Sequence, residues 1–299
     1  MKSLSDPIFV VSTTALPELR SAALRQLLTC DPIGKVAGIA HLVADVKRGA
    51  FTLDTSAILI NAAEARAIPG RPLQPELVLP KTLKHRSMRT EEGRAALIHA
   101  LAHIEFNAMN LALDAVCRFV DMPDEYYTDW LSVAGEEAQH FDMLSRHLQT
   151  LGFAYGAFPA HGSMWEMAEK TQHDVLARMA LVPRTLEARG LDATPAVRAK
   201  IAQAGDMAAA HILDIILREE VGHVAIGNHW YNWLCMAREL EPIAAFADLV
   251  REYEAPVLRG PFNIAARRAA GFTEEELTVL QSGWIVRPTA DTDVPTAGQ

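Results

Sequence analysis

Glu136-Glu137-Ala138-Gln139-His140 is followed 83 residues later by Glu219-Glu220-Val221-Gly222-His223. Each copy has another glutamate 32 or 33 residues upstream of its Glu-x-x-His acid, at Glu105 and Glu187. Two Glu-x-x-His sequences and two further acids form the pattern of a four-helix bundle that holds a pair of metal ions, because each helix turns its ligands inward. The pattern therefore predicts both a fold and a site.

The spacing within each copy explains why these residue types suit a metal. Residues three apart in a helix lie on one face, so the glutamate and the histidine of each copy reach the same point. Carboxylate and imidazole ligands suit iron or manganese. We expect two metal ions, with iron favoured over manganese or a mixed iron–manganese pair. The predicted ligands are Glu105, Glu137, His140, Glu187, Glu220 and His223.

A second acid precedes each Glu-x-x-His glutamate. Glu136 and Glu219 lie four residues before His140 and His223, a spacing that also shares a helix face. A metal-bound histidine usually donates its other ring nitrogen to a carboxylate. We therefore expect Glu136 and Glu219 behind the histidines rather than on the metals.

Helix breakers divide the central region into two helical hairpins. Helices are predicted over residues 90–120 and 124–150, and the turn between them lies midway between Glu105 and Glu137. The second hairpin is less regular. Its first arm starts near residue 163, is interrupted at Pro183 and ends at Gly190, because proline and glycine disfavour the helix interior. Thr194-Pro195 is predicted to open a short helix, and Gly205-Asp206 to precede a long helix over residues 207–240.

The bundle is expected to span residues 90–240, and the segments on either side of it are predicted to lie outside it. Residues 1–89 are predicted to form a cap, with helices at 16–28, 36–47 and 57–67, a turn at 31–34 and an extended proline-rich stretch. Short helices are expected within residues 241–286, and a loose polar tail at 287–299. No strand-like alternation is sustained, so the fold class is all-α.

The bulk composition limits the partners. The net charge of -9 argues against nucleic acid or an anionic membrane as a partner. No stretch of about 18 apolar residues is present, so no membrane partner is expected. The three cysteines form no Cys-x-x-Cys pair, which suits a reducing compartment and a cytoplasmic protein. One basic cluster at residues 81–89 is interpreted as a solvated approach to the next helix, with phosphate binding as the alternative. A homodimer is compatible with these features.

Two further histidines have a spacing that binds zinc in other proteins. His99 and His103 are four residues apart. At 100° per residue, however, His103 lies 200° around the helix from Glu105 and points away from the bundle axis. We expect a packed, hydrogen-bonded pair.

The chain resembles the ferritin-like diiron-carboxylate superfamily and, within it, the bacterial family called domain of unknown function 455. The likeness covers nearly the whole chain and is carried by residues 99–105, 158–161, 165–171, 186–192 and 220–227. The resemblance implies the bundle, the metal pair and the six ligands, but no substrate. One departure is that the acid before each Glu-x-x-His glutamate, often aspartate in relatives, is glutamate here.

The expected function is dioxygen activation by an oxidase or monooxygenase that acts on an unknown small molecule and takes electrons from an unknown donor. Two other classes stay open. One is a ferroxidase or other iron-handling protein without an organic substrate, and the other is a structural or binding protein that a metal holds together. Hydroxylation of a tRNA nucleoside, known in the superfamily, is disfavoured by the acidic balance of the chain.

Overall fold

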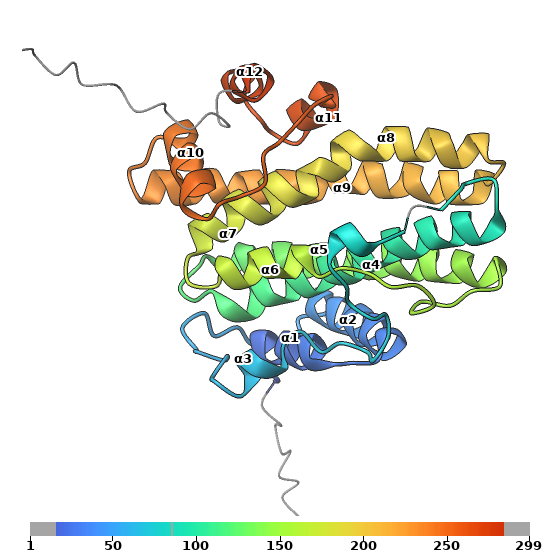
Figure 1. Ribbon diagram of the computed structural model, residues 1–299. Coiled ribbons are helices and arrows are strands. Elements are labelled where there is room, and N and C mark those ends of the chain that lie inside the picture. Colours follow the sequence, from blue (N-terminus) through green and yellow to red (C-terminus); the bar gives the residue numbers. More distant parts are fainter. Residues whose placement is uncertain (1–15, 85, 284–299) are drawn as a thin grey trace, which may run out of the picture.

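The computed structural model describes residues 16–84 and 86–283, and every regular element in this part of the chain is helical (Figure 1). Two helical hairpins lie side by side. The first consists of α4 (Glu91–Arg118) and α5 (Asp124–Thr150). The second has an arm made of α7 (Val175–Leu181), the π-helix η2 (Val182–Glu187) and α8 (Ala188–Gln203), which returns as α9 (Met207–Ala237). The all-α prediction is confirmed, whereas the predicted tail at residues 287–299 lies outside the described residues.

The first hairpin forms over the predicted ranges, and local signals fix the start of α4. The Thr90 hydroxyl accepts a hydrogen bond from the Gly93 amide, and Glu91 and Glu92 occupy the first turn of α4. Acids favour a helix start because the unpaired amides carry partial positive charge. Asp121, with φ at 57°, makes the turn into α5. These local signals set the register in which the two helices face one another.

The N-terminal segment covers the outer side of this hairpin. α1 (Leu19–Leu28) packs on α4, and α2 (Pro32–Lys47) packs on α5. The turn predicted at residues 31–34 is wrong, because Asp31 caps α2 and Pro32 is its first residue, a place where proline fits. The third predicted helix is reduced to α3 (Glu64–Ala67), and the extended stretch that follows holds only a 3-10 turn, η1 (Pro80–Thr82).

A buried arginine ties α1 to the end of α4. Arg20 is fully buried, and its guanidinium donates to the carbonyl oxygens of Val116 at 3.1 Å, Cys117 at 2.9 Å and Phe119 at 3.3 Å. The last carbonyls of a helix have no partner within the helix, so this contact satisfies groups that burial would otherwise leave unpaired.

The second hairpin departs from the prediction. The arm is broken after α6 (Ser163–Lys170), where the Asp174 side chain caps α7. The interruption predicted at Pro183 is present as a change from α-helix to π-helix rather than as a turn. Pro183 lies inside the π-helix, whose wider turn absorbs the missing amide hydrogen bond. The predicted end at Gly190 and the predicted helix start at Pro195 are wrong, because α8 continues through both residues. Ala188 and Leu191, on either side of Gly190, are fully buried and hold α8 against α9.

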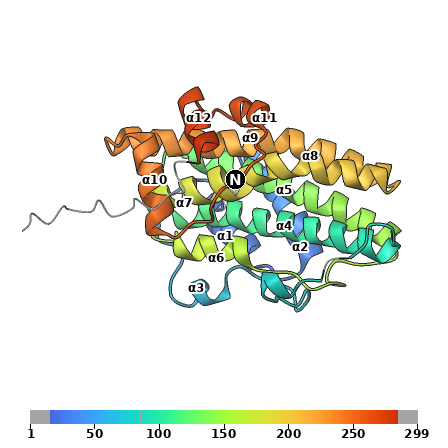
Figure 2. The same cartoon turned by 45° about the horizontal axis from the view of Figure 1, so that its top comes forward.

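Three short helices close the other side of the molecule, away from α1 and α2 (Figure 2). α10 (Pro242–Glu252), α11 (Ile264–Ala269) and α12 (Glu274–Ser282) pack along the second hairpin. A capping box formed by Thr273 and Glu276 starts α12. None of the described helices combines the length and apolar character needed to cross a membrane.

Candidate metal centre

Acidic and imidazole side chains meet in the interior between the two hairpins. One ligand atom from each of Glu105, Glu137, His140 and Glu220 lies within 4.8 Å of the others, and all four residues are buried. His223 joins them, because its Nδ1 lies 3.6 Å from Oε1 of Glu220. Side chains from α4, α5 and α9 thus form a buried group that can hold a metal ion.

Glu137 is at the centre of this group. One of its carboxylate oxygens lies 3.3 Å from Nδ1 of His140, and the other lies 3.0 Å from Nδ1 of His223. Glu105 approaches the first of these imidazoles, with an oxygen 3.5 Å from Nδ1 of His140. The two imidazole rings are 5.7 Å apart between centroids. Both histidines therefore turn the same ring nitrogen toward the carboxylates.

The Nε2 atoms of the two histidines contact the two acids that precede the Glu-x-x-His glutamates. Each histidine contacts the acid of the other hairpin, not the acid of its own helix. Nε2 of His140 lies 2.8 Å from Glu219, and Nε2 of His223 lies 2.8 Å from Glu136. The spacing had suggested that each acid would serve the histidine of its own helix. Helix packing brings each acid to the partner helix, because α5 and α9 lie against each other.

Glu187 enters from the π-helix. It is buried, its Oε2 has no hydrogen-bond partner among the described residues, and its electrostatic neighbours are Glu220, Glu137 and His223. Glu187 thus faces the same group of side chains, although it is not one of the four residues with ligand atoms within 4.8 Å of each other.

Burial and mutual repulsion shift the charge states of the acids. Burial raises the pKa of Glu105 and of Glu220, and the neighbouring Glu137 raises both further. Burial and the charge of Glu220 raise the pKa of Glu187. Glu137 is different, since its contacts with the two imidazoles outweigh burial and lower its pKa.

The histidines respond to the same carboxylates in the opposite sense. Burial alone would lower the pKa of His140, but the contacts with Glu105 and Glu137 raise it to about 11. Burial is likewise outweighed at His223, where Glu137 and the hydrogen bond to Glu136 raise the pKa. Without a cation, the site therefore has to hold several protons to offset its carboxylates.

The unpaired atoms test whether these residues fit a metal. Several buried atoms lack a hydrogen-bond partner among the described residues, although buried polar groups in native proteins are normally paired. Among them are Oε2 of Glu187 and Oε2 of Glu220, which lie in this group, while others, such as the Tyr126 hydroxyl and Nε1 of Trp130, belong to residues outside it. The two carboxylate oxygens belong to the predicted ligand set. The arrangement fits cations that would take these atoms as ligands.

A glycine on α9 makes room for the π-helix. A Cβ atom on Gly227 would lie 2.4 Å from Cβ of Pro183, so no larger residue fits without a shift. Within the π-helix, the Thr185 hydroxyl donates to the carbonyl of Ala180 at 2.9 Å, and the Ala188 amide donates to the carbonyl of Pro183. π-Helical turns inside α-helices occur frequently at functional sites. This one displays Glu187 toward the other acids.

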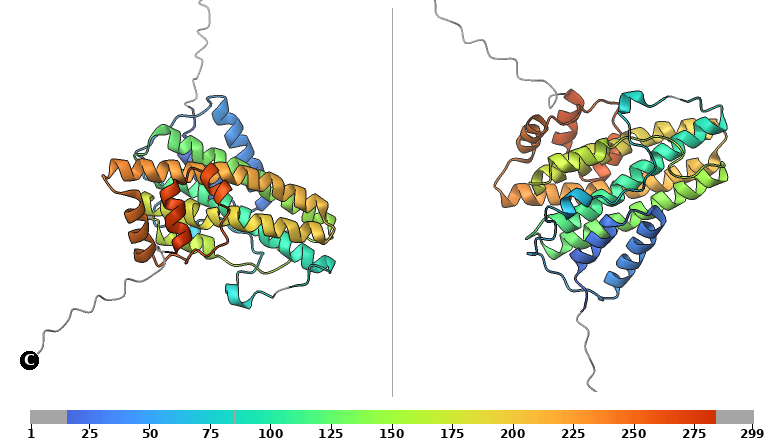
Figure 3. Two further views of the ribbon diagram at one scale, coloured as in Figure 1. Left: turned by 90° about the horizontal axis from the view of Figure 1, so that it is seen from above. Right: turned by 60° about the horizontal axis from the view of Figure 1, so that its bottom comes forward.

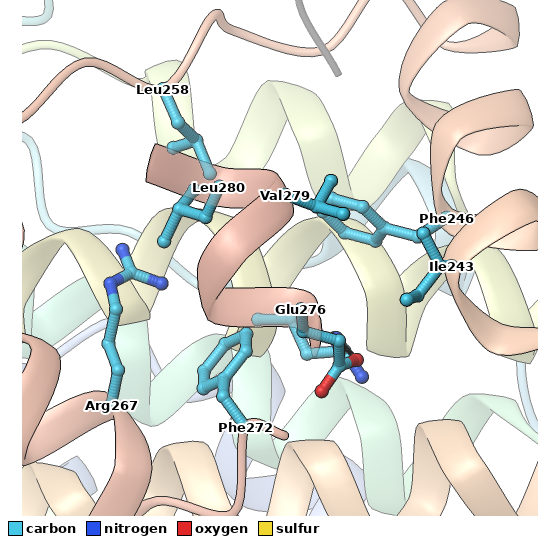
Figure 4. Close-up of a pocket in the computed structure, with 9 residues that line it drawn as sticks. Ile243, Phe246, Leu258, Arg267, Phe272, Glu276, Val279 and Leu280 are labelled. Carbon is cyan, nitrogen blue, oxygen red and sulfur yellow. Dashed lines mark hydrogen bonds and ion pairs between the residues drawn. The ribbon is translucent and has the colours of Figure 1, made fainter. Parts of the chain in front are cut away.

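The same segment is held from behind by Arg184, which the sequence did not single out. The buried guanidinium lies 2.5 Å from Glu276 of α12 and 4.2 Å from the centroid of the Tyr231 ring. Arg184, Glu276, Phe246 and Phe272 are among the residues that line a small cavity of about 20 Å³ (Figure 4). The C-terminal helices are thereby attached to the segment that ends in Glu187. The sequence signal that could have found Arg184 was its position three residues before the predicted ligand Glu187.

His99 and His103 lie apart from the group, as expected. The Gly156 amide donates to Nε2 of His99 at 3.0 Å, and the Tyr155 hydroxyl lies 2.8 Å from Nδ1 of His103. Burial lowers the pKa of His99 to about 4, so this ring stays neutral and serves to hold the loop after α5.

Comparison with known proteins agrees with the resemblance to the domain of unknown function 455 family. A Haemophilus influenzae protein (strain ATCC 51907 / DSM 11121 / KW20 / Rd), named "Uncharacterized protein", is 54% identical over 218 residues, which cover 71% of this chain and 75% of the relative. No solved structure matches the chain. The family described as "Protein of unknown function (DUF455)" matches residues 28–278. Because this match spans most of its length, the chain belongs to the DUF455 family.

Proposed function

We propose that this chain is a ferritin-like diiron-carboxylate protein that activates dioxygen, as an oxidase or monooxygenase acting on a small organic molecule. One observation carries the proposal. Carboxylates and imidazole Nδ1 atoms from both hairpins converge in a buried site, and Oε2 of Glu187 and Oε2 of Glu220 have no hydrogen-bond partner among the described residues.

The ligand inventory favours two cations over one. Four carboxylates balance the charge of two divalent ions, and a single structural ion such as zinc needs only four ligands. Glu137 faces both imidazoles, so its carboxylate would be available to hold either ion. In this assignment Glu105 and His140 belong to one ion, and Glu187, Glu220 and His223 belong to the other. Carboxylate–imidazole ligation suits iron or manganese.

Two ferrous ions, when bound, supply electrons for the reduction of dioxygen. The chain supplies the orientation of the ligands and a site protected from bulk water. Glu219 and Glu136 accept hydrogen bonds from the outer ring nitrogens of His140 and His223, which fixes the tautomer that leaves each Nδ1 free for a cation.

Iron handling without an organic substrate is the second candidate. The observation in its favour is that the Glu136 side chain is 42% exposed and the Glu219 side chain 29% exposed, although each contacts a buried histidine. Glu219 also pairs with Arg218 at 2.8 Å, so Glu136 is the acid that would offer ferrous ions a negatively charged approach to the site.

A single-turnover experiment distinguishes the candidates. Protein loaded anaerobically with ferrous iron is expected to bind about two ions per chain and to consume dioxygen on mixing. Substrate-independent formation of ferric oxide or free peroxide would favour iron handling. Folded protein that binds neither iron nor manganese would contradict the proposal, and zinc occupancy alone would undercut its redox part, because zinc has no redox chemistry.

A further inference from the structure

A small cavity, which we call the α4 cavity, lies on the side of α4 that faces away from the candidate metal centre. The extended segment that joins α3 to α4 runs along the outside of the first hairpin (Figure 3), and two of its prolines line the cavity. The polar residues of the lining are Arg71, His103, Asn107 and Tyr155, and none of the described lining residues is acidic. His103 lies about 200° around α4 from Glu105, so the cavity is separate from the buried acids.

The walls of the α4 cavity are held in place from three parts of the chain. The Val78 amide donates to the carbonyl of Ala160 at 2.8 Å, and the Ala160 amide donates to the carbonyl of Glu76 at 2.9 Å. These bonds join the extended segment to the loop after α5. Tyr155 of that loop packs on Phe106 of α4, with ring centroids 5.5 Å apart.

Asn107 contributes an unused acceptor at the buried end of the cavity, where its exposed fraction is only 5%. Its Nδ2 donates to the carbonyl oxygen of His103 at 2.7 Å, and because a carbonyl can only accept, this contact fixes which amide atom is the oxygen. Oδ1 then has no hydrogen-bond partner among the described residues. Buried polar groups are normally paired, so we expect a donor in the cavity.

The Tyr155 hydroxyl cannot supply that donor. Nε2 of His103 lies 3.2 Å from the carbonyl oxygen of His161, so this nitrogen carries the hydrogen of the neutral ring. Burial lowers the pKa of His103 to about 4, which keeps the ring neutral. Nδ1 therefore accepts from the Tyr155 hydroxyl at 2.8 Å. Having donated its one hydrogen to His103, the hydroxyl can only accept from a ligand.

The exposed end of the cavity carries a cation without a bonded partner. Arg71 forms no hydrogen bond or ion pair with the described residues, and its guanidinium lies 6.0 Å from the centroid of the Trp165 ring. Partial burial lowers the pKa of Arg71, and the nearby charge of Glu169 opposes this effect. Glu169 itself accepts a hydrogen bond from Nε1 of Trp165 at 3.0 Å. Glu76 is exposed and is not part of the described lining. The donors of Arg71 are therefore available to a carboxylate, which suits the geometry of a guanidinium.

A neighbouring charge selects the donor on the ligand. Either a hydroxyl or an ammonium group could donate to Oδ1 of Asn107. Nζ of Lys35, however, lies 5.1 Å from the centroid of the Phe106 ring, which lines the cavity. Burial lowers the pKa of Lys35 to about 7, so a second cation close to it would make its charged form still less favourable. A neutral hydroxyl avoids this cost.

The volume of the cavity sets the size of the ligand. It measures about 50 Å³. One water-sized position takes roughly 10–15 Å³, so a ligand with about five non-hydrogen atoms fits. Glycolate has this size and combines a carboxylate with a hydroxyl.

We propose that the α4 cavity binds a small hydroxycarboxylate, with its carboxylate at Arg71 and its hydroxyl donating to Oδ1 of Asn107. This site does not depend on the function proposed for the metal centre.

Ligand-observed NMR titration of the full chain tests the proposal with four matched probes. Glycolate carries both groups, acetate lacks the hydroxyl, glycolamide lacks the charge, and glycine has an ammonium group in place of the hydroxyl. Glycolate is expected to bind about fivefold more tightly than acetate and about tenfold more tightly than glycolamide, the values of one neutral and one charge-assisted hydrogen bond. Glycine should bind more weakly than glycolate. Glycolate binding that is no tighter than that of acetate and glycolamide, or weaker than that of glycine, would overturn the proposal.

Two variants assign the ends of the ligand. Arg71→Gln should weaken glycolate binding about tenfold, whereas Arg146→Gln, which removes an exposed arginine of α5 paired with Asp142, is the matched control. Asn107→Ala should make glycolate and acetate bind equally, a result that a purely structural role of Asn107 would not produce. Thermal unfolding reports whether each variant is folded. The probe series on the wild-type chain and the exposed Arg71→Gln substitution decide the proposal even if Asn107→Ala does not fold.

Coordination of glycolate by a bound metal is the competing explanation for any binding. Glu220→Ala, which removes an acid of the candidate metal centre, should leave glycolate binding unchanged. Binding that is lost in Glu220→Ala and retained in Arg71→Gln would place glycolate at the metal centre and would exclude the α4 cavity as its site.

Discussion

Nε2 of His140 lies 2.8 Å from a carboxylate oxygen of Glu219, a residue of the other hairpin. His223 makes the reciprocal contact with Glu136 at the same distance. Each hairpin therefore orients a histidine that it does not itself carry. The two halves of the candidate site depend on each other, so its geometry forms only when α5 and α9 pack together.

Glu219→Ala is expected to weaken metal binding at His140 without abolishing it. Loss of a carboxylate behind a metal-bound histidine typically lowers metal affinity 10–100-fold. Competitive titration with a chelator measures the effect, and Glu252→Ala, which removes an exposed acid of α10, is the control. Wild-type affinity in both Glu219→Ala and Glu136→Ala would mean that the crossed pairs do not support the site.

Glu220→Ala and His99→Ala should separate ligands from bystanders. Glu220→Ala removes an acid of the buried group and is expected to eliminate occupancy by two ions. His99→Ala leaves the Gly156 amide without its acceptor and should cost about 1–3 kcal/mol of stability while preserving the metal content. Metal analysis and urea unfolding of both variants provide the test. An emptied site in His99→Ala with a full one in Glu220→Ala would reverse the assignment.

Much of the site could be predicted because its residues follow the helical repeat. The i, i+3 spacing places Glu137 beside His140, and the turn near Asp121 sets Glu105 level with Glu137 without any knowledge of tertiary structure. Local signals also located the starts of α4 and α5, where the Thr90 cap of α4 and the first-turn acids of both helices act.

The second arm could not be predicted in this way, because its course depends on distant contacts. Proline and glycine usually end helices, but Gly227, 44 residues after Pro183, provides the room in which the proline ring fits. The crossed histidine pairs have the same origin. A periodic pattern shows which face of a helix a residue occupies, whereas only the packing of α5 on α9 shows which partner it meets.

Metal removal should destabilise the protein more at pH 8 than at pH 6. In the metal-free site the pKa values of Glu105, Glu187 and Glu220 are raised by burial and neighbouring acids, and those of His140 and His223 are raised by carboxylates. Groups with a raised pKa hold protons in the folded state after the unfolded chain has released them. The stability that each such group contributes to the folded protein is fully present below its pKa in the unfolded chain. It is lost as the pH rises, by about 1.4 kcal/mol per pH unit for each proton that the folded state holds in excess of the unfolded state. Glu137, whose pKa is lowered, is ionised in both states across this range and adds no slope.

Thermal unfolding with and without EDTA at the two pH values measures this effect. The EDTA-induced fall in Tm is expected to be larger at pH 8 by at least about 3 °C. Metal binding should also release protons, which a weakly buffered titration detects. A fall in Tm that is equal at both pH values, without proton release, would contradict the charge states inferred for the metal-free site.

Gly227→Ala is expected to displace the π-helix and with it Glu187. The added Cβ would lie 2.4 Å from Cβ and 2.6 Å from Cγ of Pro183, and because the proline ring is rigid, the backbone around it has to move. Overpacking of this kind costs about 1–3 kcal/mol, and the shift should weaken the ion assigned to Glu187 more than the ion assigned to Glu105. Gly222→Ala is the matched control, since an added Cβ there meets no atom within 4 Å and alanine favours the same helix by about 0.5–1 kcal/mol. Iron titration followed by Mössbauer spectroscopy should find one ion lost before the other in Gly227→Ala, and wild-type behaviour in Gly222→Ala. Equal retention of both ions in Gly227→Ala, despite a measured loss of stability, would show that the position of the π-helix does not control Glu187.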